Sequence, residues 1–445
     1  MSFFKNLFTP SSSSGQTDEG ITPSSERAFG RYTEVNKTPE QLAYWTKSLD
    51  DFAQKRYLDA FNNLLLYMLD PKVNNVTINR NAYELDFELV QGSKIIRGKA
   101  NDKTFVAETK IAQFDKLSVS FLRKLMNLNY VHQYSRFAIK ENIIYLKIDS
   151  NTIDASPNKV YFALKELALK SDKLDDFLVS EFESLHPIDC GHIIEISNEQ
   201  KEVKYKYLNL WINDTLNKIY ELNEDRMSGG ISYMILCLLF RIDYLIQPQG
   251  NLFEDIDRIN SIYNAKDNKT TMEKNRLMID ELRKLLHKSK EEIFKDFYDI
   301  KATFGYVPVT SHKQFYEFIL EQFKNTQWYY DNKYEGIVTN IYEWIIGYSI
   351  FYFGLYPATY DFLKIAYKAL QPDYFREMGM ASGFYNTSTY VFNNQAIEKE
   401  IQRVIKTNFK DYPKLTMMTA NLKYKTMNEF LFSYLNELTY LNFSK

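Results

Sequence analysis

The sequence predicts an α+β domain with an antiparallel sheet, followed by a mostly α-helical domain. The first observation is a change of period: apolar residues at helical spacing give way to strict alternation at 83–89, and the helical spacing then returns. The second observation is that nearly all of the chain after about Cys190 carries the helical period. We expect the order helix, three strands, helix, two strands, helix in the first domain.

The first helix is expected over Asp50–Leu69. Asp70-Pro71 should end it, because a proline disfavours helical backbone at the residue before it. Its apolar residues at helical spacing are Tyr57, Phe61, Leu64, Leu65 and Met68.

Strands should follow this helix. Tyr83–Leu89 alternates apolar residues with acids, which is typical of a half-buried strand. Gln91-Gly92-Ser93 indicates a turn. Two more strands are expected at Lys94–Lys99 and Thr104–Ile111, and Val76–Ile78 is expected to lead into the sheet.

A second helix is expected over Ser118–Asn129, with Ser118 as its N-cap. Its buried face should carry Phe121, Leu122, Leu125 and Leu128. The elements expected after it are strands at Tyr134–Lys140 and Asn142–Ile148, and a helix at Pro157–Glu183.

The rest of the chain should be helical after a hairpin formed by His192–Ile196 and Glu202–Tyr207. No fixed repeat period is visible, so a degenerate solenoid and a closed helical domain both stay open. The expected helices are Leu208–Asn223, Ile231–Ile246, Thr270–Thr303, His312–Lys324, Gly336–Tyr356, Ala358–Leu370, Gln395–Thr407 and Met427–Leu441.

These elements divide the chain into a tail at 1–40, the α+β domain at 41–188 and the helical domain at 189–445. The tail contains prolines and a serine run, which favour flexible sequence. Its first residues include Phe3, Phe4, Leu7 and Phe8, which would share one side of a short helix. They are either an arbitrary apolar start or a docking peptide for a partner or a membrane surface.

Composition excludes several classes of protein. The chain carries 55 Lys and Arg against 57 Asp and Glu, without a long basic run, so we expect no nucleic-acid partner. Two cysteines give no disulfide framework and suit a reducing cytoplasm. Aromatic residues make up 16% of the chain, and most of them fall on expected buried faces.

One stretch is apolar enough to suggest a membrane span. Ile337–Tyr356 is long enough to cross a bilayer, and Glu343 is its only charge. A central acid is costly in lipid, and polar residues interrupt the run. We therefore favour a buried core helix over a membrane span.

The first domain resembles the class I type III secretion chaperone fold shared by the YbjN-like family. The resemblance lies in LSVSFLRKLMNLNYVHQYSRFAIKENIIYLKID and the following SPNKVYFALKELALKSDKLDDFL, and covers about residues 50–185. It implies a small twisted sheet with helices on one face, frequent dimerisation, and binding of extended client segments. The chain departs from that family in its near-neutral charge and long helical extension, so no client or secretion system is carried over.

Three local patterns suggest sites. His186, Cys190 and His192 are ligand types that zinc accepts, although a domain-junction loop explains them without a metal. Ser228-Gly229-Gly230 is expected before a helix, where free amides could hold a phosphate or simply form a turn. Trp328, Tyr329 and Tyr330 suit a partner interface, or reflect the tyrosine-rich composition.

We therefore predict a non-enzymatic, protein-binding adaptor or chaperone-like protein of the bacterial cytoplasm, linked to a secretion or regulatory system and without a cofactor or a resident metal. It would bind a protein partner or client segment, and a homodimer is one option. The first alternative is an enzyme or metal-binding protein with its site in the helical domain. The second is a membrane-associated scaffold that uses Phe3–Phe8 or the Ile337–Tyr356 helix.

Overall fold

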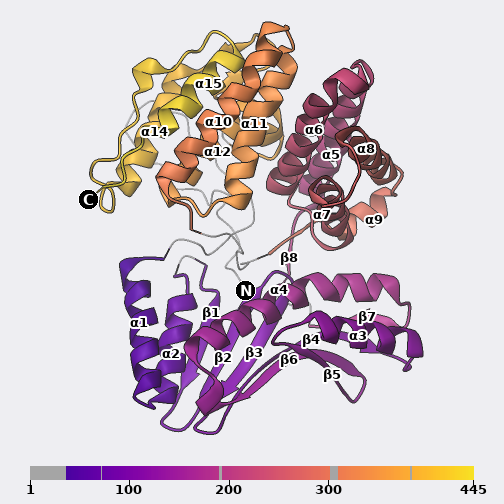
Figure 1. Cartoon of the computed structure of the whole chain (residues 1–445), viewed down its shortest axis with the longest axis vertical. Coiled ribbons are helices and arrows are strands. Elements are labelled where there is room, and N and C mark those ends of the chain that lie inside the picture. Colours follow the sequence, from indigo (N-terminus) through magenta and orange to yellow (C-terminus); the bar gives the residue numbers. More distant parts are fainter. Residues whose placement is uncertain (1–36, 72, 190–192, 301–308, 381–382, 445) are drawn as a thin grey trace, which may run out of the picture.

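The computed structural model describes residues 37–71, 73–189, 193–300, 309–380 and 383–444 (Figure 1). It confirms the predicted fold class: an α+β part with an antiparallel sheet precedes a mostly helical part. The buried apolar residues form two separate clusters, one ending at Leu185 and the other beginning at Ile196.

The α+β part contains four α-helices, a 3-10 turn and a seven-stranded sheet. The helices are α1 (Pro39–Ala53), α2 (Tyr57–Met68), α3 (Val119–Val131) and α4 (Pro157–Glu181), with the 3-10 turn η1 (Thr152–Asp154) before α4. The strands are β1 (Val76–Arg80), β2 (Leu85–Gln91), β3 (Lys94–Ala100), β4 (Thr104–Phe114), β5 (Arg136–Lys140), β6 (Ile143–Asn151) and β7 (Leu185–Pro187).

Strands pair antiparallel in the order β1-β2-β3-β4-β6-β5, and β7 pairs with β4. Alternation places Leu85, Phe87 and Leu89 in the core and leaves Asp86 and Glu88 exposed. Helices α2, α3 and α4 contact the strands, and α4 crosses the sheet on the side that faces the helical part (Figure 1).

The opposite face of the sheet is polar. Arg97 on β3 lies 3.1 Å from Glu88 on β2, and the side chain of Lys99 lies 2.8 Å from Glu84. Such cross-strand pairs suit a solvated face.

On β3, Gly98 is required by close packing, because a Cβ at this position would lie 2.0 Å from the ring of Phe87.

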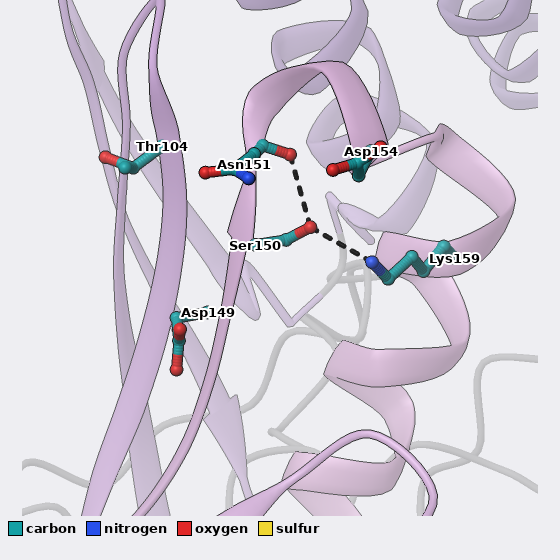
Figure 2. A pocket seen from close by; sticks show the side chains of 6 residues that line it. All are labelled: Thr104, Asp149, Ser150, Asn151, Asp154 and Lys159. Carbon is teal, nitrogen blue, oxygen red and sulfur yellow. Dashed lines mark hydrogen bonds between the residues drawn. The ribbon is translucent and has the colours of Figure 1, made fainter.

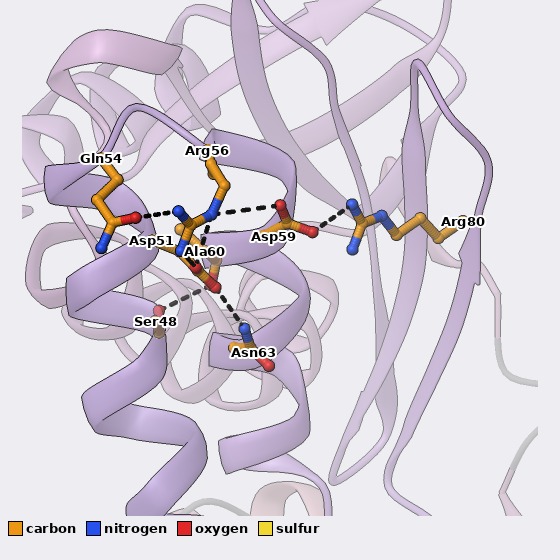
Figure 3. A network of polar contacts seen from close by, with 8 residues as sticks. All are labelled: Ser48, Asp51, Gln54, Arg56, Asp59, Ala60, Asn63 and Arg80. Atoms are coloured by element: carbon orange, nitrogen blue, oxygen red, sulfur yellow. Dashed lines mark hydrogen bonds and ion pairs between the residues drawn. The ribbon is translucent and has the colours of Figure 1, made fainter.

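The single helix expected over Asp50–Leu69 is two helices. Lys55 has a φ of 62°, a left-handed conformation that ends α1. The turn is held by buried Asp51, which accepts hydrogen bonds from Arg56 and, at 2.7 Å, from Asn63 of α2 (Figure 3). Ser48 of α1 also donates to the carbonyl of Ala60, at 2.7 Å.

The helical part is built around one apolar cluster. Its α-helices are α5 (Asn198–Tyr220), α6 (Glu224–Arg241), α7 (Gly250–Asn264), α8 (Thr271–Leu286), α9 (Lys290–Lys295), α10 (His312–Asp331), α11 (Glu335–Tyr352), α12 (Pro357–Leu370), α13 (Pro372–Glu377), α14 (Asn394–Asn408) and α15 (Met427–Leu438). The π-turn η2 (Ile242–Ile246), the 3-10 turn η3 (Thr419–Asn421), and the strands β8 (Ile194–Glu195), β9 (Tyr298–Asp299), β10 (Tyr385–Asn386) and β11 (Val391–Phe392) complete it.

Two expected elements in this part were wrong. The predicted hairpin does not form, because residues 198–220 are helical and β8 pairs instead with β9. The single helix expected over Thr270–Thr303 is divided into α8 and α9, and Ser289 caps the second of these.

The apolar stretch around Glu343 is a core helix of the folded chain. Helix α11 packs against α6, α10, α12 and α15, and the Glu343 carboxylate binds Arg241 of α6. Within the described residues, one helix is long and apolar enough to cross a membrane, Glu224–Ile246, and 83% of its most apolar window is buried in the protein.

The two parts meet where α4 contacts α7. The Lys173 Nζ of α4 lies 2.7 Å from an Asp257 carboxylate oxygen of α7. Near the chain connection, buried Lys94 pairs with Asp175 at 2.8 Å and donates to the carbonyl of Ile188 at 3.2 Å. Helix α4 therefore contacts both the sheet and the helical part.

Candidate functional site

The histidine and cysteine pattern at the junction is only partly described. The His186 Nε2 of β7 lies 2.6 Å from an Asp115 carboxylate oxygen, and both side chains are exposed. Cys190 and His192 lie outside the described residues. Among the residues that are described, no group of three or more His, Cys, Asp or Glu could hold a metal ion.

Residues Trp328, Tyr329 and Tyr330 lie on α10 and do not form one patch. Tyr329 packs against the helical core, while Trp328 and Tyr330 are 45% and 54% exposed. The Trp328 ring stacks on Tyr334, with centroids 6.1 Å apart. The four Phe and Leu residues of the N-terminal segment, Phe3, Phe4, Leu7 and Phe8, lie outside the described residues.

The glycine pair proposed as a phosphate site is inside a helix. Gly229 and Gly230 lie in α6, directly after a kink at Met227, whose φ of −112° and ψ of 15° are not helical. A Cβ on Gly230 would lie 2.9 Å from Ile337 and 3.1 Å from Tyr329. The glycines therefore allow the end of α10 and the start of α11 to approach α6.

An open, polar cavity of about 640 Å³ lies at the ends of β4 and β6 (Figure 2). Its lining residues are Thr104, Asp149, Ser150, Asn151, Asp154 and Lys159. The Lys159 Nζ donates to Ser150 Oγ at 3.0 Å. Serine beside lysine can act as nucleophile and base, but a lysine used in this way is desolvated, whereas Lys159 is exposed in a polar, open site. We therefore assign it no reaction.

The structure brings together His132, Ser135 and Glu166, a set of residue types that resembles a catalytic triad. Their order is different from that of a triad, in which the histidine stands between the carboxylate and the nucleophile. Here Ser135 Oγ stands between them, donating to Glu166 at 2.8 Å and lying 3.2 Å from His132 Nδ1. Ser135 is fully buried, so a substrate could not reach its hydroxyl.

This cluster is a structural clamp. Glu166 of α4 accepts hydrogen bonds from the backbone N–H groups of Gln133, Tyr134 and Ser135 at 2.8–3.0 Å. Burial raises the pKa of Glu166, but these hydrogen bonds outweigh burial and leave the pKa below its ordinary value. The clamp fixes the turn between α3 and β5.

Helix α3 is apolar on two sides, and only one side is buried. Phe121 and Leu125 face the core, where the Phe121 ring lies against Phe114 and Phe182. On the outer side, three apolar residues seven and four positions apart share one face of the helix. They are Val119, Met126 and Tyr130, with exposures of 66%, 71% and 91%, and we call them the α3 stripe.

The surroundings of the α3 stripe extend its apolar surface. Leu117 before the helix and Val131 at its end are more than half exposed, and Ile139 of β5 is 40% exposed. Single exposed apolar residues are ordinary, whereas several of them gathered on one surface are typical of an interaction site.

The same segment is cationic. Residues 116–140 contain Lys116, Arg123, Lys124, Arg136 and Lys140, and no Asp or Glu. Lys124 pairs with Glu181 at 2.9 Å, and Arg136 donates to backbone carbonyls. Lys116, Arg123 and Lys140 form no ion pair with the part of the chain that the structure describes.

Strand β5 lies beside α3 at the edge of the sheet. Its outer edge is partly closed, because Asn129 of α3 accepts the N–H of Phe137 at 2.6 Å. Arg136 and Lys140 at the two ends of the strand are exposed cations, a common device against edge-to-edge pairing.

Sequence reasoning identified the buried face of α3 but missed the outer one. The available signal was Val119, Met126 and Tyr130 at positions where a half-buried helix would carry polar residues.

No protein-family model and no curated protein matches the chain.

Proposed function

We propose that the protein is a protein-binding adaptor or chaperone-like protein and that it binds its partner through the α3 stripe. The observation that carries this proposal is the exposure of Val119, Met126 and Tyr130 on one face of a helix whose other face is already buried. Covering these side chains would remove apolar area from water, which is the main favourable term in protein association.

Two further features support a binding role. The acid, hydroxyl and imidazole groups that meet at Glu166 are used to hold the backbone. The antiparallel sheet with helices on one face also suits the proposed YbjN-like and secretion-chaperone resemblance, in which such a domain holds extended client segments. A bacterial cytoplasmic setting belongs to the same proposal.

Site-specific photo-crosslinking tests the proposal. A photoreactive amino acid would replace Met126 in one variant and Asn158, which is exposed near the start of α4, in the control. We expect a defined crosslinked protein from the Met126 position in the native organism, and loss of that product when Tyr130→Asp is added. Equal crosslinking from both positions, or none from Met126, would refute the proposal.

A further inference from the structure

We propose that the partner segment on the α3 stripe is an acidic amphipathic helix. This inference rests on the proposed function, because it names the chemistry of the partner that the stripe binds. The proposal follows from the shape of the stripe, from the state of the neighbouring strand edge and from the charges around both.

The shape of the stripe suits a helix. Helix α3 has 13 residues, which corresponds to a length of about 20 Å. Its three exposed apolar side chains follow one line along the helix axis, with Val119 near one end and Tyr130 near the other. A partner helix lying along this line would present apolar anchors at positions i, i+3 or i+4, and i+7.

The strand edge disfavours an added strand. Strand addition needs unpaired backbone groups along the edge. On β5 the N–H of Phe137 is already bound by Asn129, and in an antiparallel ladder only every second residue directs its N–H and C=O outward. The edge that remains is short, and Arg136 and Lys140 flank it.

The charges around the stripe select an acidic partner. Arg123 lies four residues after Val119 and three before Met126, so it shares their face and places a cation within the stripe. Lys116 and Lys140 are exposed near the two ends of the surface, each next to an exposed carboxylate, Asp115 and Glu141, so the net positive charge is centred on Arg123. Carboxylates flanking the partner's apolar anchors would meet these cations, which favours specificity and fast association.

The same charges argue against a second copy of the chain. Two α3 stripes facing each other would bring the cations of both copies into one interface, and like charges across an interface are unfavourable. An anionic membrane would also attract the cations. Asp115, before α3, and Glu181, beside Lys124, are carboxylates at the margin of the surface, and a flat anionic bilayer would repel them.

Binding of designed peptides to the full chain tests the inference. The acidic probe is a labelled 15-residue helix with leucines along one face and glutamates on both flanks, and the matched basic probe carries lysines in place of the glutamates. We expect the acidic peptide to bind at least about 10-fold more tightly than the basic one, and its affinity to fall as salt is raised.

Protein variants locate the site of binding. Met126→Ala and Tyr130→Ala should each weaken binding of the acidic peptide by about 10-fold or more, whereas Asn158→Ala on α4 should leave the affinity unchanged. Arg123→Glu should reduce or reverse the preference for the acidic peptide. All four side chains are exposed, and circular dichroism would verify that each variant is folded.

The outcomes separate this inference from the proposed function. Equal affinity for both peptides, with loss of binding in Met126→Ala, would refute the acidic partner while the binding surface stands. No binding of either peptide, together with no crosslink at Met126, would refute both. Met126-dependent binding to vesicles of phosphatidylglycerol and phosphatidylcholine, without peptide binding, would overturn the inference in favour of a membrane. A dimer that Met126→Asp dissociates would overturn it in favour of a second copy.

Discussion

The buried ion pair between Arg241 of α6 and Glu343 of α11 gives a prediction that follows directly from its geometry. Two hydrogen bonds of 2.6 Å join the guanidinium to the two carboxylate oxygens. The side chains are only 10% and 2% exposed. Burial lowers the pKa of Arg241, but the charge and the hydrogen bonds of Glu343, with smaller contributions from other neighbours, together leave the pKa above its ordinary value, so the guanidinium stays charged.

Removing one partner leaves the other charged and buried. For such one-sided changes the free energy of unfolding falls by about 3–5 kcal/mol. We expect a loss in this range for Glu343→Leu. For Arg241→Met we expect the same range, with an added loss of about 0.5–2 kcal/mol because the guanidinium also lies 5.5 Å from the Trp211 ring.

The double variant Arg241→Met, Glu343→Leu should lose much less stability than the sum of the two single losses. With both charges replaced by apolar groups of similar length, no unpaired charge is left in the core. Buried pairs replaced in this way are often neutral or stabilising. We therefore expect the double variant to unfold within about 2 kcal/mol of the unchanged protein and to be more stable than either single variant.

Urea unfolding followed by circular dichroism at 222 nm measures these differences. The control is the exposed pair Lys218–Asp214, whose charged atoms are also close, at 2.7 Å. Asp214→Ala should lower the free energy of unfolding by only about 0.3–0.5 kcal/mol, because water already solvates both charged groups. The reasoning would be wrong if Glu343→Leu cost less than the control, or if the double variant lost the sum of the two single losses.

Three smaller predictions concern other named contacts. Glu166→Gln should lower the free energy of unfolding by about 1–3 kcal/mol at pH 7. Because the folded-state pKa of Glu166 is lowered, this difference should disappear as pH falls below about 4.5 and the unchanged side chain is protonated; a difference that persists at low pH would contradict it. Gly347→Ala should lower the free energy of unfolding by about 1–3 kcal/mol, because the new Cβ would lie 2.6 Å from Phe240 Cβ. In the control Gly336→Ala, on the same helix, the new Cβ meets no atom within 4 Å, so thermal unfolding should show an unchanged or higher stability. Burial raises the pKa of Asp296 to about 6, so ionisation of this carboxyl destabilises the folded state as pH rises through that value. The Asp296→Asn variant should therefore unfold at a higher urea concentration than the unchanged protein at pH 8 and at the same concentration at pH 4. An equal difference in urea midpoint at both pH values would refute this pH dependence.

Periodicity predicted the fold class and most elements of the α+β part, because one face of each strand or helix is buried, but it missed most of α1 and the short strand β7. It failed where an apolar pattern runs through a backbone break. The helical spacing of Tyr57 and Phe61 continues the pattern before them, and the left-handed conformation of Lys55 that separates α1 from α2 leaves no trace in that pattern.

The false hairpin at 202–207 had a signal against it. The segment KEVKYKY alternates like a strand, yet Ser197 and Gln200 stand at the spacing of a capping box. In the structure Ser197 accepts the N–H of Gln200 at the start of α5. The capping residues therefore decided the local structure, and the short alternation did not.

The candidate site was less predictable than the fold. Helix α3 is apolar on both sides, so only its packing decides which side is left in water. Phe121 meets Phe114 and Phe182, which lie on β4 and just after α4. The clamp at Glu166 likewise joins residues 31 positions apart in sequence, a distance that no local motif can indicate.

The position of α4 connects the proposed binding surface with the rest of the molecule. Glu166 and Lys173 are seven residues apart and therefore lie on one face of this 25-residue helix. Glu166 fixes the end of α3 and the start of β5, and Lys173 binds Asp257 of the helical part. A surface held in this way loses little conformational freedom when it is covered, which favours binding. A partner on the α3 stripe would then be held at a fixed position relative to the helical part, which is the geometry that an adaptor requires.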